Sequence, residues 1–196
     1  MKQEYGRYKL IFSLKMIRNL ILMILIVGCN NDYVLPKPRA YLYEQFDENQ
    51  EYYVYDSDCG FSFFANKSST IDSNGCNLKL HNTDLKSTIF FTIVNVDENI
   101  SLIQKDFDNK LDENSKNAFY VKSSEYVNSN KKIYAKYFTF SGDTPSNTQF
   151  FITDSISKYI SGSLFFESKP NYDSLLPSIE FTNNEIRKLI QSFNWN

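Results

Sequence analysis

A short apolar run that ends at Gly28-Cys29 limits how much of this chain can belong to a folded domain. The run covers residues 20–27, and the residues before it carry five basic side chains and one acidic side chain. A membrane-spanning helix needs about 20 apolar residues, so this run is too short to be one. A basic start, a short apolar run and a small residue before a cysteine are typical of a bacterial lipoprotein signal peptide. We therefore predict cleavage after Gly28 and lipidation of Cys29; the alternatives are a plain membrane anchor and a buried cysteine.

This cleavage would divide the chain into a signal peptide (1–28), a lipidated, proline-containing tether (29–40) and one domain (41–196). Removal of the signal leaves 168 of the 196 residues, which is enough for a single sizeable core. These residues carry 16 basic and 22 acidic side chains, a net charge of −6. An acidic chain argues against a nucleic-acid partner, which would need a basic patch. Membrane contact is expected instead through acyl chains, such as palmitate, on Cys29.

Two cysteines, Cys59 and Cys76, remain once Cys29 is lipidated. An exported protein matures in an oxidising compartment, where two such cysteines favour one disulfide over two separate buried thiols. The polar stretch 66–75 between them reads as a loop that the disulfide would close. A metal site is not expected, because His81 is the only histidine and two cysteines do not make a zinc ligand set.

Strand patterns dominate the rest of the chain. Residues 87–96 (STIFFTIVNV) are rich in β-branched and aromatic side chains and are the best candidate for a central strand. The other expected strands are 41–46, 52–55, 61–63, 78–80, 120–127, 132–140, 149–153 and 159–166. We expect a single α+β domain with a largely antiparallel sheet.

Two helices are expected to pack on this sheet. From Asp97 onward, apolar residues recur at helical spacing over about 15 to 20 residues. Near the C-terminus, Thr182 and Glu185 match a capping box, with Thr182 as N-cap and Pro177 setting the approach of the chain. The side chains expected to face the core are Ile100, Ile103, Phe107 and Leu111 in the first helix, and Ile186, Leu189, Ile190 and Phe193 in the second.

The sequence lacks the familiar catalytic and cofactor motifs. The chain contains no nucleophile elbow, no phosphate-binding loop, no zinc-protease motif and no dinucleotide-binding glycines. His81 stands alone and reads as a strand histidine. We therefore expect no enzymatic activity, no cofactor and no catalytic residue.

Two segments are candidates for contact with a partner. Tyr52 and Tyr53 belong to a local cluster of tyrosines that can stack on sugars or on a protein, or can simply pack in a hairpin. The segment Pro36-Lys37-Pro38-Arg39 favours an extended arm, which can serve as a docking strand or as a spacer above the membrane.

Two smaller features also bear on the surface. Gly162 lies in an expected strand, where glycine often marks a bulge or a close approach of another group. The triplets around Ser155 and Ser174 resemble short bacterial O-glycosylation acceptor sites.

Three segments together resemble the gliding-motility lipoprotein GldD family of the Bacteroidota. They are PKPRAYLYEQF at 36–46, the motif CGFSF at Cys59 with its partner Cys76, and residues 149–181, which are the most specific. The chain departs from the family pattern at Ala40, Gly60 and Asn77. The order of elements also resembles the Mog1/PsbP α/β sandwich, an analogy of fold alone.

The resemblance implies a lipoprotein of the cell envelope that is needed for gliding over surfaces. It implies protein partners in a gliding machine coupled to type IX secretion, and it transfers no catalytic residue. We expect the domain to face the periplasm, with the inner and outer membranes both open as the site of anchoring. The rival hypothesis is a ligand- or polysaccharide-binding envelope lipoprotein that uses the tyrosine hairpin.

Overall fold

The computed structural model describes residues 16, 19, 50–96, 100–167 and 172–196. Met16 and Asn19 are helical and exposed. The predicted cleavage and lipidation sites (Gly28 and Cys29), the arm Pro36–Arg39 and the strand expected at 41–46 lie outside the described residues. Within the part of the chain that is described, no helix is long and apolar enough to cross a membrane.

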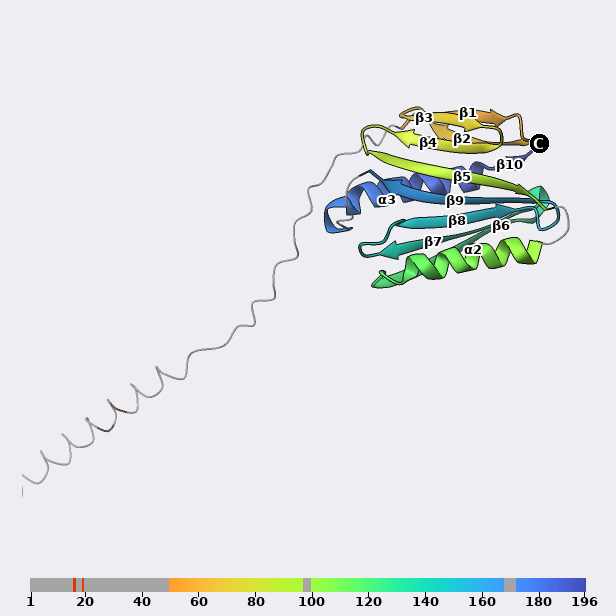
Figure 1. Cartoon of the computed structure of the whole chain (residues 1–196). Coiled ribbons are helices and arrows are strands. Elements are labelled where there is room, and N and C mark those ends of the chain that lie inside the picture. Colours follow the sequence, from red (N-terminus) through yellow and green to blue (C-terminus); the bar gives the residue numbers. More distant parts are fainter. Residues whose placement is uncertain (1–15, 17–18, 20–49, 97–99, 168–171) are drawn as a thin grey trace, which may run out of the picture. The chain divides into compact units, whose positions relative to one another are not determined.

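Seven antiparallel strands form the main sheet, in the order β3-β4-β5-β9-β8-β7-β6 (Figure 1). Their bounds are β3 Ser69–Asn74, β4 Asn77–Asn82, β5 Ser87–Asn95, β6 Tyr120–Asn128, β7 Ile133–Ser141, β8 Thr148–Thr153 and β9 Lys158–Phe166. Strand β5 has a partner on each side, as expected of a strand rich in β-branched and aromatic residues. The α+β fold with an antiparallel sheet is confirmed.

A second, three-stranded sheet has the order β1-β2-β10, with β1 at Tyr52–Ser57, β2 at Phe61–Asn66 and β10 at Asn194–Trp195. Successive side chains of a strand point to opposite faces, so Phe61 and Phe63 of β2 both face the core. Their rings pack on Phe193 and Phe91, with centroids 5.6 and 5.9 Å apart. The small sheet is therefore joined to the main sheet through aromatic side chains.

Two α-helices cover opposite faces of the main sheet: α2 (Ile100–Ser115) and α3 (Tyr172–Ser192). A short 3-10 turn, η1 (Ser129–Lys131), links β6 to β7. Helix α2 inserts Phe107 among Phe138, Phe151 and Tyr159, with ring centroids 5.3 to 6.5 Å apart. Helix α3 packs Ile186, Leu189 and Ile190 onto the other face, as predicted. Of the stripe predicted for α2, only Phe107 is fully buried; Ile100, Ile103 and Leu111 are half-buried.

The predicted start of the last helix is wrong. Helix α3 includes Tyr172, so both Pro177 and Thr182 lie inside it. The Thr182 hydroxyl donates to the Ser178 carbonyl one turn earlier, 2.8 Å away. The Glu185 carboxylate accepts a hydrogen bond from Tyr52 in strand β1. Ile179 and Thr182 are each 4% exposed, so burial against the sheet holds this turn in helical form whatever cap the local sequence suggests.

The predicted loop at 66–75 is also wrong, because most of it is strand β3. This strand lies at the edge of the main sheet and is largely exposed, which explains its polar composition. Gly75, with φ +59°, makes the turn into β4. The predicted disulfide between Cys59 and Cys76 is present, and it links the β1–β2 turn of the small sheet to the β3–β4 turn of the main sheet.

Candidate functional site

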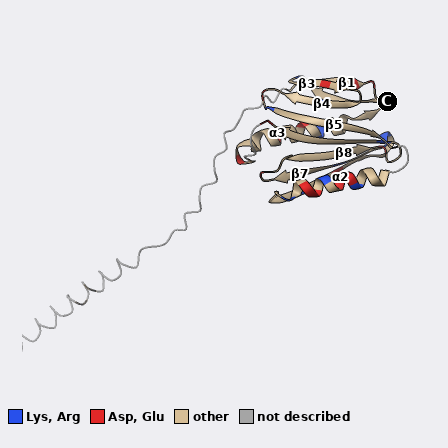
Figure 2. Ribbon diagram, viewed as in Figure 1, with Lys and Arg blue, Asp and Glu red and all other residues tan. Residues whose placement is uncertain are grey.

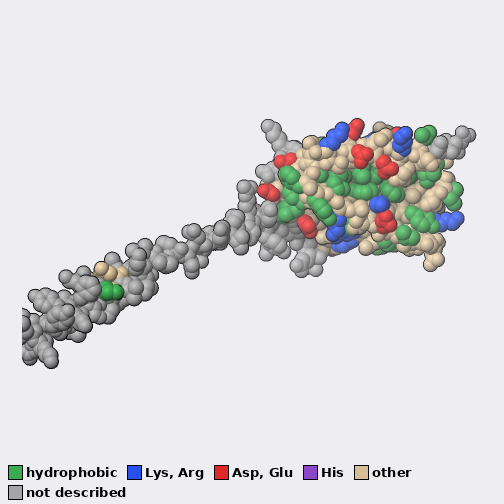
Figure 3. All heavy atoms as spheres, turned by 90° about the horizontal axis from the view of Figure 1, so that it is seen from below, with side chains coloured by type: hydrophobic (Ala, Val, Ile, Leu, Met, Phe, Trp, Pro, Cys, Tyr) green, Lys and Arg blue, Asp and Glu red, His purple; other side chains and the backbone are tan. Residues whose placement is uncertain are grey.

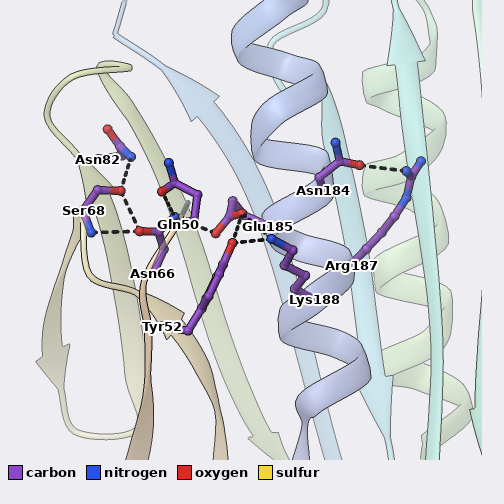
Figure 4. A network of polar contacts seen from close by, with 9 residues as sticks. All are labelled: Gln50, Tyr52, Asn66, Ser68, Asn82, Asn184, Glu185, Arg187 and Lys188. Atoms are coloured by element: carbon purple, nitrogen blue, oxygen red, sulfur yellow. Dashed lines mark hydrogen bonds and ion pairs between the residues drawn. The ribbon is translucent and has the colours of Figure 1, made fainter. Parts of the chain in front are cut away.

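Tyr52 joins the small sheet to helix α3 (Figure 4). Its hydroxyl donates to Glu185 Oε1 at 2.6 Å and accepts from Lys188 Nζ at 2.5 Å. The Lys188 ammonium also lies 4.4 Å from the centre of the Tyr52 ring, a favourable cation–π contact. Burial, reinforced by the Glu185 carboxylate, raises the pKa of Tyr52. The phenol therefore stays protonated and acts as a fixed hydrogen-bond donor.

The same carboxylate continues the network into the strands. Glu185 Oε2 accepts from Asn66 Nδ2 at 2.9 Å, and that amide also donates to Gln50 at 2.6 Å. The side-chain oxygen of Asn66, Oδ1, accepts hydrogen bonds from both the backbone N–H and the hydroxyl of Ser68. This hydroxyl in turn accepts from the side-chain amide of Asn82 in β4. Figure 4 shows the side chains converging from both sheets and α3. The network therefore fixes the small sheet against α3 and β4.

An apolar surface lies beside this network. Val54 and Phe64 are opposite each other in the β1–β2 register and share a face with Tyr52. They are 61% and 50% exposed, respectively. A shallow hollow of about 380 Å³ runs from Tyr52 and Phe64 to Lys188 and Gln191 on α3. We name this surface, made by Tyr52, Val54, Phe64, Lys188 and Gln191, the Phe64 face. Exposed apolar side chains with a polar rim are typical of a protein interaction site.

The two tyrosines singled out from the sequence do not share a surface. Tyr52 belongs to the Phe64 face, whereas Tyr53 points to the opposite face of β1 because the residues of a strand alternate. Tyr53 is 37% exposed. Sequence reasoning missed Phe64, because the expected strand 61–63 ended one residue before it. In the structure β2 continues to Asn66, and the alternation of side chains puts Phe64 on the face opposite Phe63.

The two candidate glycosylation serines lie in different settings. Ser155 is exposed in the β8–β9 turn at φ +65°. Hydrogen bonds from backbone N–H groups to Asp154 shape this turn; although burial acts to raise the pKa of Asp154, these bonds lower it overall. Ser174 is exposed in the first turn of α3.

The described ranges hold no arrangement typical of a metal site. No group of three His, Cys, Asp or Glu side chains there is arranged to hold a metal ion. His81 lies in strand β4, as expected, with Nδ1 3.0 Å from the Thr88 hydroxyl and 3.9 Å from Glu167. Its surroundings are those of a half-buried strand residue.

A family model described as "Gliding motility lipoprotein GldD" matches residues 31–195. Among the described elements, the match includes both sheets, helices α2 and α3, and all of the Phe64 face. No curated protein matches the chain.

Proposed function

We propose that this chain, which belongs to the gliding motility lipoprotein GldD family, is a lipid-anchored, non-enzymatic part of the apparatus that moves cells over surfaces. The observation that carries the proposal is the family match over residues 31–195. Lipoprotein character and gliding motility follow from the family itself. A link to type IX secretion, and an origin in the Bacteroidota, are supported by the resemblance of the three segments described above.

We place the lipid anchor at Cys29, which becomes the first residue when the signal peptide is cleaved between Gly28 and Cys29. The basic start, the short apolar run and the small residue before the cysteine support this site. Residues 29–40, including Pro36, Lys37, Pro38 and Arg39, would tether the domain or dock to a partner. The family implies the cell envelope, and the Cys59–Cys76 disulfide supports a domain that faces the oxidising periplasm.

Replacing Cys29 by alanine in the native organism is expected to release the protein from the membrane and to stop colony spreading. Several acyl chains hold a protein firmly to a bilayer, and without them the acidic domain has no comparable attachment. Membrane fractionation and spreading on agar measure the two effects, with Asn31→Ala as the control. A protein that stays in the membrane would exclude lipidation at Cys29. A released protein that still supports spreading would show that the tether is dispensable.

The Phe64 face is proposed as the surface that binds a protein of the gliding apparatus. Phe64→Ser is expected to weaken this contact by roughly 30-fold, because a buried aromatic anchor contributes about 2 kcal/mol. Spreading and co-purification of cross-linked envelope proteins are the readouts. Val127→Ser is the matched control, since Val127 is 59% exposed on the other sheet. Equal behaviour of the two variants, both folded, would remove the Phe64 face as the contact.

A further inference from the structure

A cavity of about 290 Å³ lies between α2 and the main sheet, on the face away from α3. The helix supplies Phe107 and Ile103 to one wall, and Ser161 and Ser163 of β9 lie on the other. Helix α2 has two fully buried side chains, Phe107 and Asn114, and its other side chains are half-buried or exposed. Seen from the side on which α2 lies, Figure 3 shows hydrophobic side chains exposed between acidic and basic ones.

Two residues that line this cavity carry polar atoms without a partner. Gln149 Oε1 and the Tyr159 hydroxyl are buried and, within the part of the chain that the structure describes, make no hydrogen bond. Gln149 is 8% exposed and Tyr159 is 1% exposed. Native proteins leave few such atoms unpaired, because the loss of water is then uncompensated. Burial raises the pKa of Tyr159, so its phenol keeps the proton that it can donate.

The other side chains that line the cavity favour an uncharged, polar ligand. Asp106 and Lys110 bring one charge of each sign, and Figure 2 shows both signs along α2, so a charged ligand would find no net attraction. Hydroxyl groups of Ser161, Ser163 and Thr92 can each donate and accept.

Two aromatic rings mark the exposed part of the cavity. Phe90 and Phe165 are each 38% exposed and pack edge to face, with centroids 5.6 Å apart. Aromatic faces combined with hydroxyl and amide side chains suit a molecule with apolar C–H faces and many hydroxyls. The volume is close to the lower limit of about 300 Å³ for small-molecule pockets, which fits one ring better than a chain.

We propose that this cavity binds a single uncharged sugar residue. Its hydroxyls would pair with the Gln149 amide and the Tyr159 phenol, and its C–H face would lie against Phe90 and Phe165. Both polar atoms are covered in the present arrangement, so entry of the sugar requires a small outward shift of α2 or a turn of the Gln149 amide. This site is separate from the Phe64 face and does not depend on the partner proposed there.

The test uses the full chain in a detergent that contains no sugar. N-acetylglucosamine, glucose and galactose are titrated as uncharged probes, glucuronate and glucosamine as charged probes, and indole as an apolar probe. Saturation-transfer NMR measures binding, and hydrogen exchange follows α2. We expect at least one uncharged sugar to bind with a dissociation constant of about 1 mM, typical of a small ligand, and to change exchange in α2.

Variants connect this binding to the cavity. Gln149→Leu, and separately the double variant Ser161→Ala/Ser163→Ala, are expected to weaken it about tenfold, or ~1.4 kcal/mol. Ser123→Ala, on β6 and outside the lining, is the control. The proposal is overturned if no uncharged sugar binds, if only indole or a charged sugar binds, or if both folded cavity variants keep the affinity of the unmodified chain.

Discussion

Replacing Gly162 by alanine is expected to destabilise the domain by about 3 kcal/mol or more, the upper range for an overpacked core. A Cβ atom built at Gly162 would lie only 2.1 Å from Phe150 Cζ, and two further ring atoms would lie within 2.7 Å. Phe150 and Phe91 are the strand partners on either side of this glycine, and both are buried. The ring therefore has little room to move, so either the backbone or the aromatic packing must shift. Unfolding in urea measures the change in the free energy of unfolding.

A second substitution tests whether the ring is the cause. Phe150→Leu removes the ring atoms that clash, so Gly162→Ala/Phe150→Leu is expected to lose at least ~1 kcal/mol less than the sum of the single variants. Gly75→Ala is the matched control. Its Cβ meets nothing within 4 Å, and the positive φ alone costs about 1 kcal/mol. If Gly162→Ala were no more harmful than Gly75→Ala, the close approach of Phe150 would not matter for stability.

Removing the disulfide with Cys59→Ser/Cys76→Ser is expected to cost about 3 kcal/mol, as loop closure of this length predicts. The cysteines are 17 residues apart, and their link restricts the unfolded chain. It also holds the β1–β2 turn against the β3–β4 turn, so its loss loosens one end of both sheets. For a domain of this size the melting temperature is expected to fall by roughly 6–12 °C.

Reductant supplies the control for this result. Dithiothreitol is expected to lower the melting temperature of the unmodified chain to that of the double variant, and to leave the variant itself unchanged. Equal melting temperatures for the oxidised chain and the variant would mean that the bond adds nothing to stability. A reductant effect on the variant would point to a cause other than Cys59–Cys76.

Strands with strong β-formers were predictable, and strands defined by their neighbours were not. The patterns in β5, β8 and β9 put apolar residues on a buried face, which is a local property of the sequence. Strand β3 is polar because it lies at an exposed edge, and β10 is only two residues long. Strand β3 is held by the hydrogen bonds of β4, which follows it directly, but its polar side chains show no alternation that would indicate a strand. Strand β10 exists because β2, far away in the sequence, offers it hydrogen bonds, and no sequence window contains that partner.

The same distinction between local patterns and distant contacts applies to the candidate site. The Cys59–Cys76 bond could be predicted from the expected compartment, because only two cysteines remained to pair. The contact between Tyr52 and Glu185 joins residues 133 positions apart, so no local pattern signals it. The capping box predicted at Thr182 and Glu185 is absent because α3 begins ten residues earlier, and the Glu185 carboxylate instead accepts hydrogen bonds from the small sheet.

The pairing of β2 with β10 sets an order of events during synthesis. Ser62 of β2 and Asn196 are bonded across 134 residues, and the Asn196 backbone N–H donates to the Gly60 carbonyl. A ribosome adds about 5–20 residues per second, so β2 waits on the order of 10 s for this partner. During that interval Phe61 lacks the ring of Phe193 that will pack on it. Until β10 has been synthesised, the nascent chain therefore exposes an unpaired edge of β2 and apolar surface beside it. In that period it depends most on a chaperone or on prompt export.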